Sequence, residues 1–368
     1  MRILIVTDTH RTQTNGVVRT LSTLRDILQR RGHVVGWIDM EGFAALGWPT
    51  YPEIRLALWP GPALARQIEA FAPDAIHIAT EGFLGMAARR YCRKRRLPFT
   101  TAFHSRLPEY LASHVGLPLW FSFAWLRWFH GASAGVMVST PTQRRELQDR
   151  GFQRLRAWTR GVDQTLFFPR PHTGASAFWR SLPRPALLYV GRVAPEKNLE
   201  AFLSLPCHGS KVVVGEGPSR RALEQTYPEA HFLGVLQGEA LAQAYCASDA
   251  LVFPSKTDTF GLVMLEALAC GTPVAAFPAP GPLDVIGPTL EAPRPVGALH
   301  PDLQIAVAKA LRVSREACVA YARTFSWAES ADQFVGNLRP FNPQRRALSE
   351  KAAPEPGEIL ESATAAAV

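Results

Sequence analysis

The chain has 368 residues, of which 47% are hydrophobic and 19% are charged. This length suits two domains of roughly 150–200 residues, and the apolar content excludes a mainly disordered chain. The net charge is +9, but it is unevenly placed: residues 1–170 carry +11 and residues 171–368 carry −2. A positive field confined to one half indicates an anionic partner, such as phosphates, nucleic acid or an acidic lipid surface.

The chain shows no segment typical of secretion or of a membrane span. Residues 1–10 hold one Arg and a short apolar run that ends at Asp8, which predicts a first buried strand. The longest low-charge apolar run, residues 115–126, is too short to cross a bilayer. The five cysteines contain no CxxC, which argues against a disulfide framework or a structural zinc site. We therefore expect a cytoplasmic protein whose membrane contact is at most peripheral.

Short apolar runs alternate with helical patterns along almost the whole chain. This alternation predicts the α/β class, with two doubly wound parallel sheets covered by helices. The expected strands are residues 3–6, 34–38, 75–78, 99–102 and 136–138 in the first half, and 186–190, 211–214, 231–233, 251–253 and 274–276 in the second. Such sheets bind ligands beyond the carboxyl ends of their strands.

Proline and a Gly/Ser/Thr-rich segment mark the boundary between the two halves. Pro169 and Pro171 cannot lie inside a helix, and a polar stretch follows them. We expect domains over residues 1–168 and 169–325, and a helix over 326–342 that returns to the first domain. Residues 343–368 are rich in Ala, Pro and Glu, so we expect a disordered tail there.

Two loops that follow predicted strands offer anion-binding groups. The first lacks GxGxxG, which weakens a dehydrogenase assignment, but it places Gly16 at a helix start, where backbone N–H groups can approach an anion. An ordinary turn and helix cap is the alternative. The second loop, VGRVAPEKN, supplies Arg192 and Lys197, which could hold a diphosphate from two sides or be solvated cations. Glu216, in VVGEGP, could face a ligand or water.

The segment PSKTDTFGLVMLEALACGTPV carries two carboxylates around a helix start. Asp258 precedes the helix and Glu266 lies about two turns along it, so their targets should differ. The amides of Phe260 and Gly261 would bind phosphates between them. A structural salt bridge is the alternative for Glu266, because an acid inside LVMLEALA is otherwise awkward.

Together these segments resemble the family 4 glycosyltransferases of the GT-B fold, in which two Rossmann-like domains face each other across the active site. The resemblance covers about residues 1–340 and rests on NGVVR, RGVDQTLFFP, GRVAPEKN, VVGEGP, DTFGLVMLE and ALACGTPV. It implies a first domain that binds the acceptor and a second that binds the nucleotide sugar.

The resemblance also assigns roles to individual residues. It implies that Arg192 and Lys197 bind the donor diphosphate, that Glu266 binds the ribose hydroxyls and that Asp258 contacts the donor sugar. Gly16 would approach the phosphates from the other domain. The chain departs from the family pattern in having Asp258 where Glu is usual, which shortens the reach of that carboxylate by one methylene.

Two further segments resemble the subgroup that glycosylates membrane lipids, which includes sulfoquinovosyl-, glucuronosyl- and glucosyl-diacylglycerol synthases and phosphatidylinositol mannosyltransferases. These segments are TYPEIRLALWPG and AFHSRLPEYL. The resemblance places His104, at the end of a predicted strand, near the transferred sugar or the acceptor hydroxyl. The alternative is a histidine satisfied within the structure.

The basic half also offers a membrane-binding surface. Arg93, Lys94, Arg95 and Arg96 gather at a helix end, where cations attract anionic lipid. Residues 118–130 add an aromatic set that includes Trp120, Phe121 and Trp125. A solvated helix end and a buried core helix are the respective alternatives. Nucleic-acid binding would use the same residue types, but the loop motifs favour a nucleotide sugar, so no nucleic-acid partner is expected.

These observations favour a metal-independent hexosyltransferase, and the resemblance implies that it retains the configuration of the transferred sugar. It would move a hexose or hexuronic acid from UDP-glucose or UDP-glucuronate to a membrane lipid, diacylglycerol first, on the cytoplasmic face of an anionic membrane. No cofactor or metal is expected, because the chain has no HExxH and no DxD in a plausible loop. The alternatives are a GDP-mannose-dependent α-mannosyltransferase acting on a lipid or glycan, a sugar-nucleotide epimerase, and a non-catalytic membrane- or nucleotide-binding protein.

Overall fold

The computed structural model describes residues 1–10, 16–48, 51–104, 118–171 and 176–341. Within these ranges the chain divides into two compact units. The first comprises residues 1–160 and 327–341, and the second comprises residues 161–326. The predicted tail at 343–368 lies outside the described residues.

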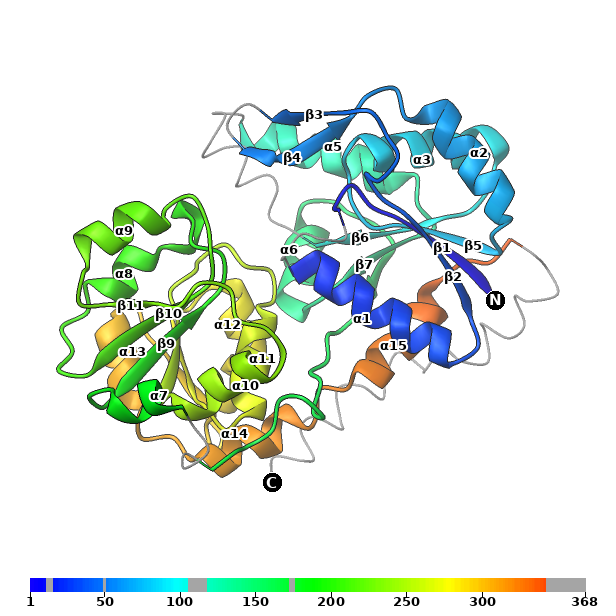
Figure 1. Ribbon diagram of the computed structural model, residues 1–368. Coiled ribbons are helices and arrows are strands. Elements are labelled where there is room, and N and C mark those ends of the chain that lie inside the picture. The colour runs from blue at the N-terminus through cyan, green and yellow to red at the C-terminus, as the bar shows by residue number, and fades with distance from the viewer. Residues whose placement is uncertain (11–15, 49–50, 105–117, 172–175, 342–368) are drawn as a thin grey trace. The chain divides into compact units, whose positions relative to one another are not determined.

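The first unit is built on a six-stranded parallel sheet (Figure 1). Its strand order is β2-β1-β5-β6-β7-β8. The strands are β1 (Arg2–Val6), β2 (Val34–Ile38), β5 (Ala75–Ile78), β6 (Thr100–Phe103), β7 (Gly135–Val138) and β8 (Leu155–Ala157). A hairpin of β3 (Ala45–Trp48) and β4 (Tyr51–Ala57), which the sequence analysis does not predict, forms a separate antiparallel pair.

Helices cover both faces of this sheet, which is why β1 is apolar and buried from Ile3 to Val6. Ile3 and Ile5 pack on the side of α1 (Gly16–Arg30) and α15 (Trp327–Asn337). Leu4 and Val6 pack on the side of α2 (Gly61–Phe71) and α3 (Phe83–Arg95). Two further helices, α5 (Leu119–Gly131) and α6 (Pro141–Asp149), pack with the ends of β6 and β7.

The second unit repeats the plan with a second parallel sheet in the order β11-β10-β9-β12-β13-β14. The strands are β9 (Ala186–Val190), β10 (Ser210–Val214), β11 (His231–Phe232), β12 (Ala250–Phe253), β13 (Val274–Ala276) and β14 (Gly297–Leu299). The helices are α7 (Ala177–Ser181), α8 (Leu199–Leu203), α9 (Arg220–Thr226), α10 (Gly238–Ala247), α11 (Leu262–Ala269), α12 (Pro280–Val285), α13 (Leu303–Ala310) and α14 (Arg315–Ala322). The prediction of two doubly wound parallel sheets is confirmed.

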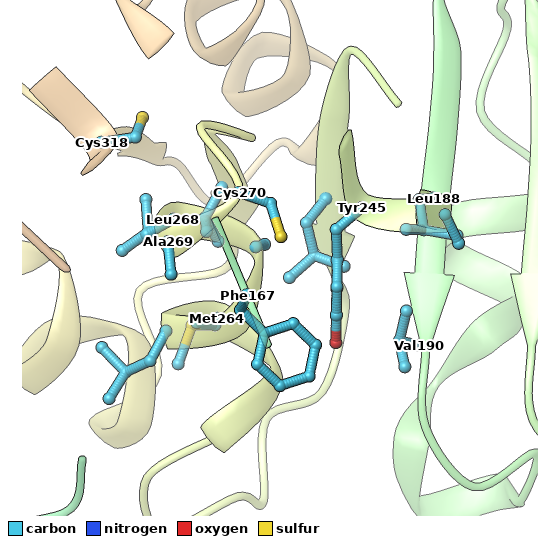
Figure 2. Close-up of a cluster of buried hydrophobic side chains, with 14 of the residues drawn as sticks. Phe167, Leu188, Val190, Tyr245, Met264, Leu268, Ala269, Cys270 and Cys318 are labelled. Atoms are coloured by element: carbon cyan, nitrogen blue, oxygen red, sulfur yellow. The ribbon is translucent and has the colours of Figure 1, made fainter. Parts of the chain in front are cut away.

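The larger hydrophobic cluster of the second unit lies where α10 packs on β9 and α11 packs on β12 and β13. Alternate strand residues Leu188 and Val190 point toward Tyr245 of α10, and Phe167 fills the space between Tyr245 and α11 (Figure 2). The rings of Phe167 and Tyr245 meet edge to face, with centroids 5.8 Å apart. The predicted boundary at 168/169 therefore falls within a segment, residues 161–171, that packs with the second unit.

The last helix, α15, lies beside α1 in the first unit (Figure 1). Phe334 and Leu338 are fully buried with Leu21 and Leu24 of α1. Gln333 accepts a hydrogen bond from the Thr159 amide at 2.8 Å. The chain thus returns to its first unit after completing the second.

This packing makes Phe334 a sensitive probe of how α15 stabilises the first unit. Phe334→Ala should lower the free energy of unfolding by about 3–5 kcal/mol, because it leaves a cavity in a fully packed core. Leu311→Ala is the control, since Leu311 is 37% exposed. Urea unfolding measures both variants, and equal small losses would show that α15 contributes little.

Candidate functional site

The second sheet has a point at which its connections change direction. Strand β9 pairs with β10 on one side and with β12 on the other, so the chain runs outward from β9 in both directions. The carboxyl ends of strands at such a point leave a crevice that binds ligands in doubly wound sheets. The loops after β9 and β12 are therefore expected to form a ligand-binding site.

An ion pair joins these two loops. Lys197 follows β9 and Asp258 follows β12, and their Nζ and Oδ1 atoms lie 2.6 Å apart. About a quarter of each side chain remains exposed, at 23% and 24%. The structure thus brings together two of the predicted site residues, and both of them can be reached from solvent.

Hydrogen bonds also connect the same two loops and fix their positions relative to each other. Asn198, with a left-handed backbone at φ +56°, donates from its side chain to the Pro254 carbonyl at 3.2 Å. Thr257 donates to the Glu196 carbonyl, also at 3.2 Å. Tyr189 donates to the Arg192 carbonyl at 2.7 Å and so shapes the turn that carries Arg192. The loop after β9 is therefore positioned before any ligand binds.

The VVGEGP turn requires glycine because two backbones meet there. A Cβ on Gly215 would lie 1.8 Å from the Gly191 carbonyl oxygen, and one on Gly217 would lie 2.2 Å from that of Val193. Glu216, between them, forms an ion pair with Arg220 of α9, and its side chain is 51% exposed. The sequence analysis missed this partner, although the i,i+4 spacing is typical of such pairs.

The loop after β12 ends at the start of α11. Gly261 has φ +87°, and a Cβ there would lie 2.7 Å from the Met264 side chain. Phe260 is buried, and its carbonyl and that of Asp258 lie 3.0 Å from where a Cβ on Gly281 would be. No side chain caps α11, so its first amides lack the partner that a capping residue would supply. Such an N-terminus suits a phosphate.

Glu266 lies on α11 with only 3% of its surface exposed. Its Oε2 accepts a hydrogen bond from the hydroxyl of Tyr245 at 2.9 Å. Tyr245 was not among the predicted site residues, because it comes from a different helix and is 21 positions away in sequence. A buried carboxylate held this way is pre-oriented for a ligand with hydroxyl groups.

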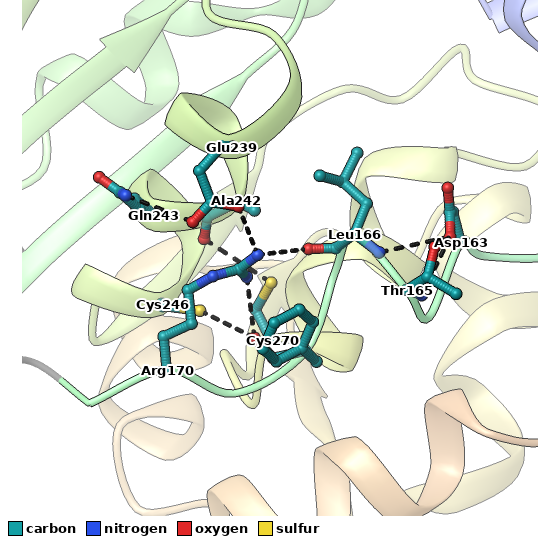
Figure 3. Close-up of polar contacts among 10 residues, drawn as sticks. Asp163, Thr165, Leu166, Arg170, Glu239, Ala242, Gln243, Cys246 and Cys270 are labelled. Atoms are coloured by element: carbon teal, nitrogen blue, oxygen red, sulfur yellow. Dashed lines mark hydrogen bonds and ion pairs between the residues drawn. The ribbon is translucent and has the colours of Figure 1, made fainter. Parts of the chain in front are cut away.

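The segment before β9 fixes the helix that carries Tyr245. Arg170 donates to the Leu166 carbonyl at 2.8 Å and to Glu239 of α10 at 2.7 Å (Figure 3). The Cys246 thiol donates to the Phe168 carbonyl at 3.2 Å. A hydrogen bond with the Cys270 thiol, opposed by burial and aided by Arg170, lowers the pKa of Cys246. The five cysteines are free thiols.

His104, in the first unit, lies at the carboxyl end of β6. Its Nδ1 is 3.4 Å from Arg160, and its ring meets Trp158 edge to face at 5.4 Å. Burial, and then the charge of Arg160, hold the pKa of His104 well below its usual value, so the ring is neutral at pH 7. Burial also lowers the pKa of Arg160 to about 9. Gly16 begins α1 and is exposed.

The predicted membrane-binding residues fall into two groups. Arg93, Lys94, Arg95 and Arg96 are all exposed, and of these Arg95 forms an ion pair with Glu69 and Arg96 caps the end of α3 with φ +56°. On α5, Trp120 and Phe121 are 73% and 49% exposed. Trp125 instead packs partly against the core. No described helix is long and apolar enough to cross a membrane.

Two family models match the chain. "Glycosyltransferase Family 4" matches residues 14–166 and "Glycosyl transferases group 1" matches residues 184–312. Among curated proteins, a GDP-mannose-dependent alpha-mannosyltransferase of Mycobacterium tuberculosis is 27% identical over 94% of this chain and 98% of its own length. A sulfoquinovosyl transferase of Arabidopsis thaliana is 32% identical over 65% of this chain and 49% of its own.

Solved structures share the fold at low sequence identity. Sucrose-phosphate synthase from Thermosynechococcus elongatus has a TM-score of 0.70 at 22% identity, covering 91% of this chain and 97% of its own. The Anabaena protein HepE, solved with UDP and glucose, has a TM-score of 0.68 at 16% identity, covering 91% and 98%. These neighbours confirm the predicted two-domain fold.

The Tyr245–Glu266 contact gives a testable consequence. Tyr245→Phe should lower the free energy of unfolding by about 1–3 kcal/mol, since it leaves a buried carboxylate without one donor. The control is Tyr321→Phe, which removes a 2.8 Å bond to the uncharged carbonyl of Val285. Its cost should be smaller, about 0.5–1.5 kcal/mol. Urea unfolding compares them, and an equal loss would mean that the charge of Glu266 is stabilised elsewhere.

Proposed function

We propose that this chain, which belongs to the family 4 glycosyltransferases of the GT-B fold, transfers a hexose or hexuronic acid from a nucleotide-diphosphate sugar to a hydroxyl of a membrane lipid. Use of a nucleotide sugar follows from the family and from the relatives. The observation that carries the proposal is the Lys197–Asp258 ion pair, which joins the two loops at the switch point of the second sheet.

The donor diphosphate would bind between Arg192, Lys197 and the first amides of α11. Lys197 would then exchange Asp258 for a phosphate oxygen, which frees the Asp258 carboxylate to accept hydrogen bonds from the donor sugar. Glu266, held by Tyr245, would accept them from the ribose. As the bond to the sugar breaks, negative charge grows on the diphosphate, and preorganised cations and amides stabilise it.

The reaction we propose retains configuration at the anomeric carbon and needs no metal. The departing phosphate oxygen would take the proton of the acceptor hydroxyl on the same face of the sugar. His104 would lie beside the acceptor as a neutral hydrogen-bonding group, in keeping with its lowered pKa. Glu216 would remain at the edge of the donor site, paired with Arg220.

The proposed acceptor is a lipid, diacylglycerol first, presented at the cytoplasmic face of an anionic membrane. Support comes from the exposed cations at the end of α3, from the exposed Trp120 and Phe121 on α5, and from the sulfoquinovosyl transferase relative. Exposed aromatic side chains and exposed cations are each typical of protein surfaces that meet the interface between water and lipid.

A second candidate donor is GDP-mannose. The mannosyltransferase relative covers 94% of this chain, whereas the sulfoquinovosyl transferase covers 65%. The base of the donor therefore has to be decided by experiment, together with the sugar.

The decisive assay offers purified protein UDP-glucose, UDP-glucuronate or GDP-mannose, each with vesicles that contain diacylglycerol or phosphatidylinositol. We expect a labelled lipid product from one donor. Lys197→Ala should lower turnover about hundredfold, because it removes one donor of hydrogen bonds to the transition state. Lys309→Ala, on α13, should not. Absence of product from every donor, or full activity of Lys197→Ala, would refute the proposal, and conversion of donor alone would indicate an epimerase.

Membrane binding is tested separately by sedimentation with anionic vesicles. Replacing both Arg93 and Lys94 by Gln should weaken binding about thirtyfold at low salt, since each cation near the surface contributes about 1 kcal/mol. The effect should shrink as salt screens the charges. Arg144 and Arg145 are exposed on α6 and form the matched control pair. If both double variants sediment alike, the end of α3 is merely solvated.

A further inference from the structure

Two carboxylates lie at the switch point of the first sheet, and neither takes part in the proposed donor site. Strand β1 pairs with β2 on one side and β5 on the other, so the chain changes direction between β1 and β5. Asp8 follows β1 and Glu81 follows β5. By the argument used for the second sheet, a ligand of the first unit should bind near these two side chains.

Asp8 is committed to the fold. Its carboxylate accepts hydrogen bonds from the amides of Leu84 and Gly85, at 2.7 and 3.3 Å, and from the Thr80 hydroxyl at 2.8 Å. It thereby caps the start of α3. Glu81 differs in its partner, because its carboxylate lies against a histidine ring and not against helix amides.

The carboxylate of Glu81 lies against a buried histidine, His130. His130 of α5 is 1% exposed, and its Nε2 lies 3.2 Å from Glu81 Oε1. The other ring nitrogen, Nδ1, is 2.9 Å from the Thr101 hydroxyl. Thr101 donates its single proton to Ser133, whose own proton goes to the His130 carbonyl. Thr101 must therefore accept from Nδ1–H, and Nε2 lies toward Glu81. An attractive contact with the Glu81 carboxylate then requires the imidazolium form, in which both ring nitrogens carry protons.

Glu81 and His104 follow the neighbouring strands β5 and β6 at the same edge of the sheet. The charge of His130 is one of the causes that lower the pKa of His104, and the rings of Phe103 and His130 are 6.0 Å apart. A carboxylate and a neutral imidazole are both groups that bind hydroxyls.

We infer that Glu81 binds a hydroxyl of the acceptor and that His130 is its positioning residue. The inference rests on the proposed function and names the residue of the first unit that recognises the acceptor. A carboxylate accepts a hydrogen bond from a hydroxyl more strongly than a neutral group does. A purely stabilising role is a weaker account, because removing two ionisable groups from water costs about as much as their attraction returns.

The test is Glu81→Gln, which keeps the size of the side chain and removes its charge. With the sugar nucleotide that the wild type uses and diacylglycerol vesicles, kcat/KM for the acceptor should fall about ten- to hundredfold. The KM for the donor, and the slow release of nucleotide without acceptor, should stay unchanged. Glu146→Gln is the matched control, since Glu146 forms an ion pair with Arg150 in the same unit.

His130→Gln should change the acceptor and donor constants in the same pattern but less strongly, and the double variant should resemble Glu81→Gln alone because the two residues act together. Equal losses on the donor and acceptor sides, tracking a loss of folded protein, would show a structural role and overturn the inference. So would wild-type acceptor kinetics in Glu81→Gln. A wild type that is inactive with all three donors would instead overturn the proposed function, and this inference with it.

Discussion

The contact between Lys197 and Asp258 is the constraint on which the arrangement of the second unit's site depends. The two residues are 61 positions apart, and each follows a strand at the centre of the sheet. Their ion pair, with the hydrogen bonds from Asn198 and Thr257, sets the distance between the two loops that carry every proposed diphosphate ligand except Gly16. A partly exposed ion pair adds little stability. Its contribution is to position two opposite charges where a bound ligand can replace either partner of the ion pair.

The same topology produces a different solution in the first unit. There both residues at the switch point are carboxylates, and their contacts differ. The carboxylate of Asp8 accepts hydrogen bonds at the start of α3, and desolvation raises its pKa. Glu81 instead forms an ion pair with His130. One sheet thus presents a cation beside an anion, and the other presents an anion supported by an imidazole. The first pattern suits a diphosphate, and the second suits a neutral hydroxyl.

The sequence predicts the sheets well because the strands of a parallel sheet are apolar on both faces. It misses β8 and β14, which have three residues each, and the β3–β4 hairpin, whose sequence lacks a clear alternation. The motif residues Arg192, Lys197, Asp258 and Glu266 can be found because they lie in short segments with glycine and proline around them. Their partners cannot. Tyr245 and His130 have no local signal, since what makes them important is a contact across many positions of the chain.

The positive charge of the first half lies only partly on the surface. A count of residues does not distinguish exposed cations from buried ones, and several arginines are buried and stabilise the fold. Arg89 is 5% exposed, donates to the carbonyls of Trp128 and Phe129, and lies over the Trp128 ring at 3.8 Å. Arg160 is buried as well and stacks on Trp158. These cations stabilise the ends of α5 and β8 and cannot attract a membrane. Other cations of this half are exposed, among them Arg93 and Lys94 at the end of α3 and Arg144 and Arg145 on α6. Net charge therefore indicates that an anionic partner exists, while burial decides which residues can meet it.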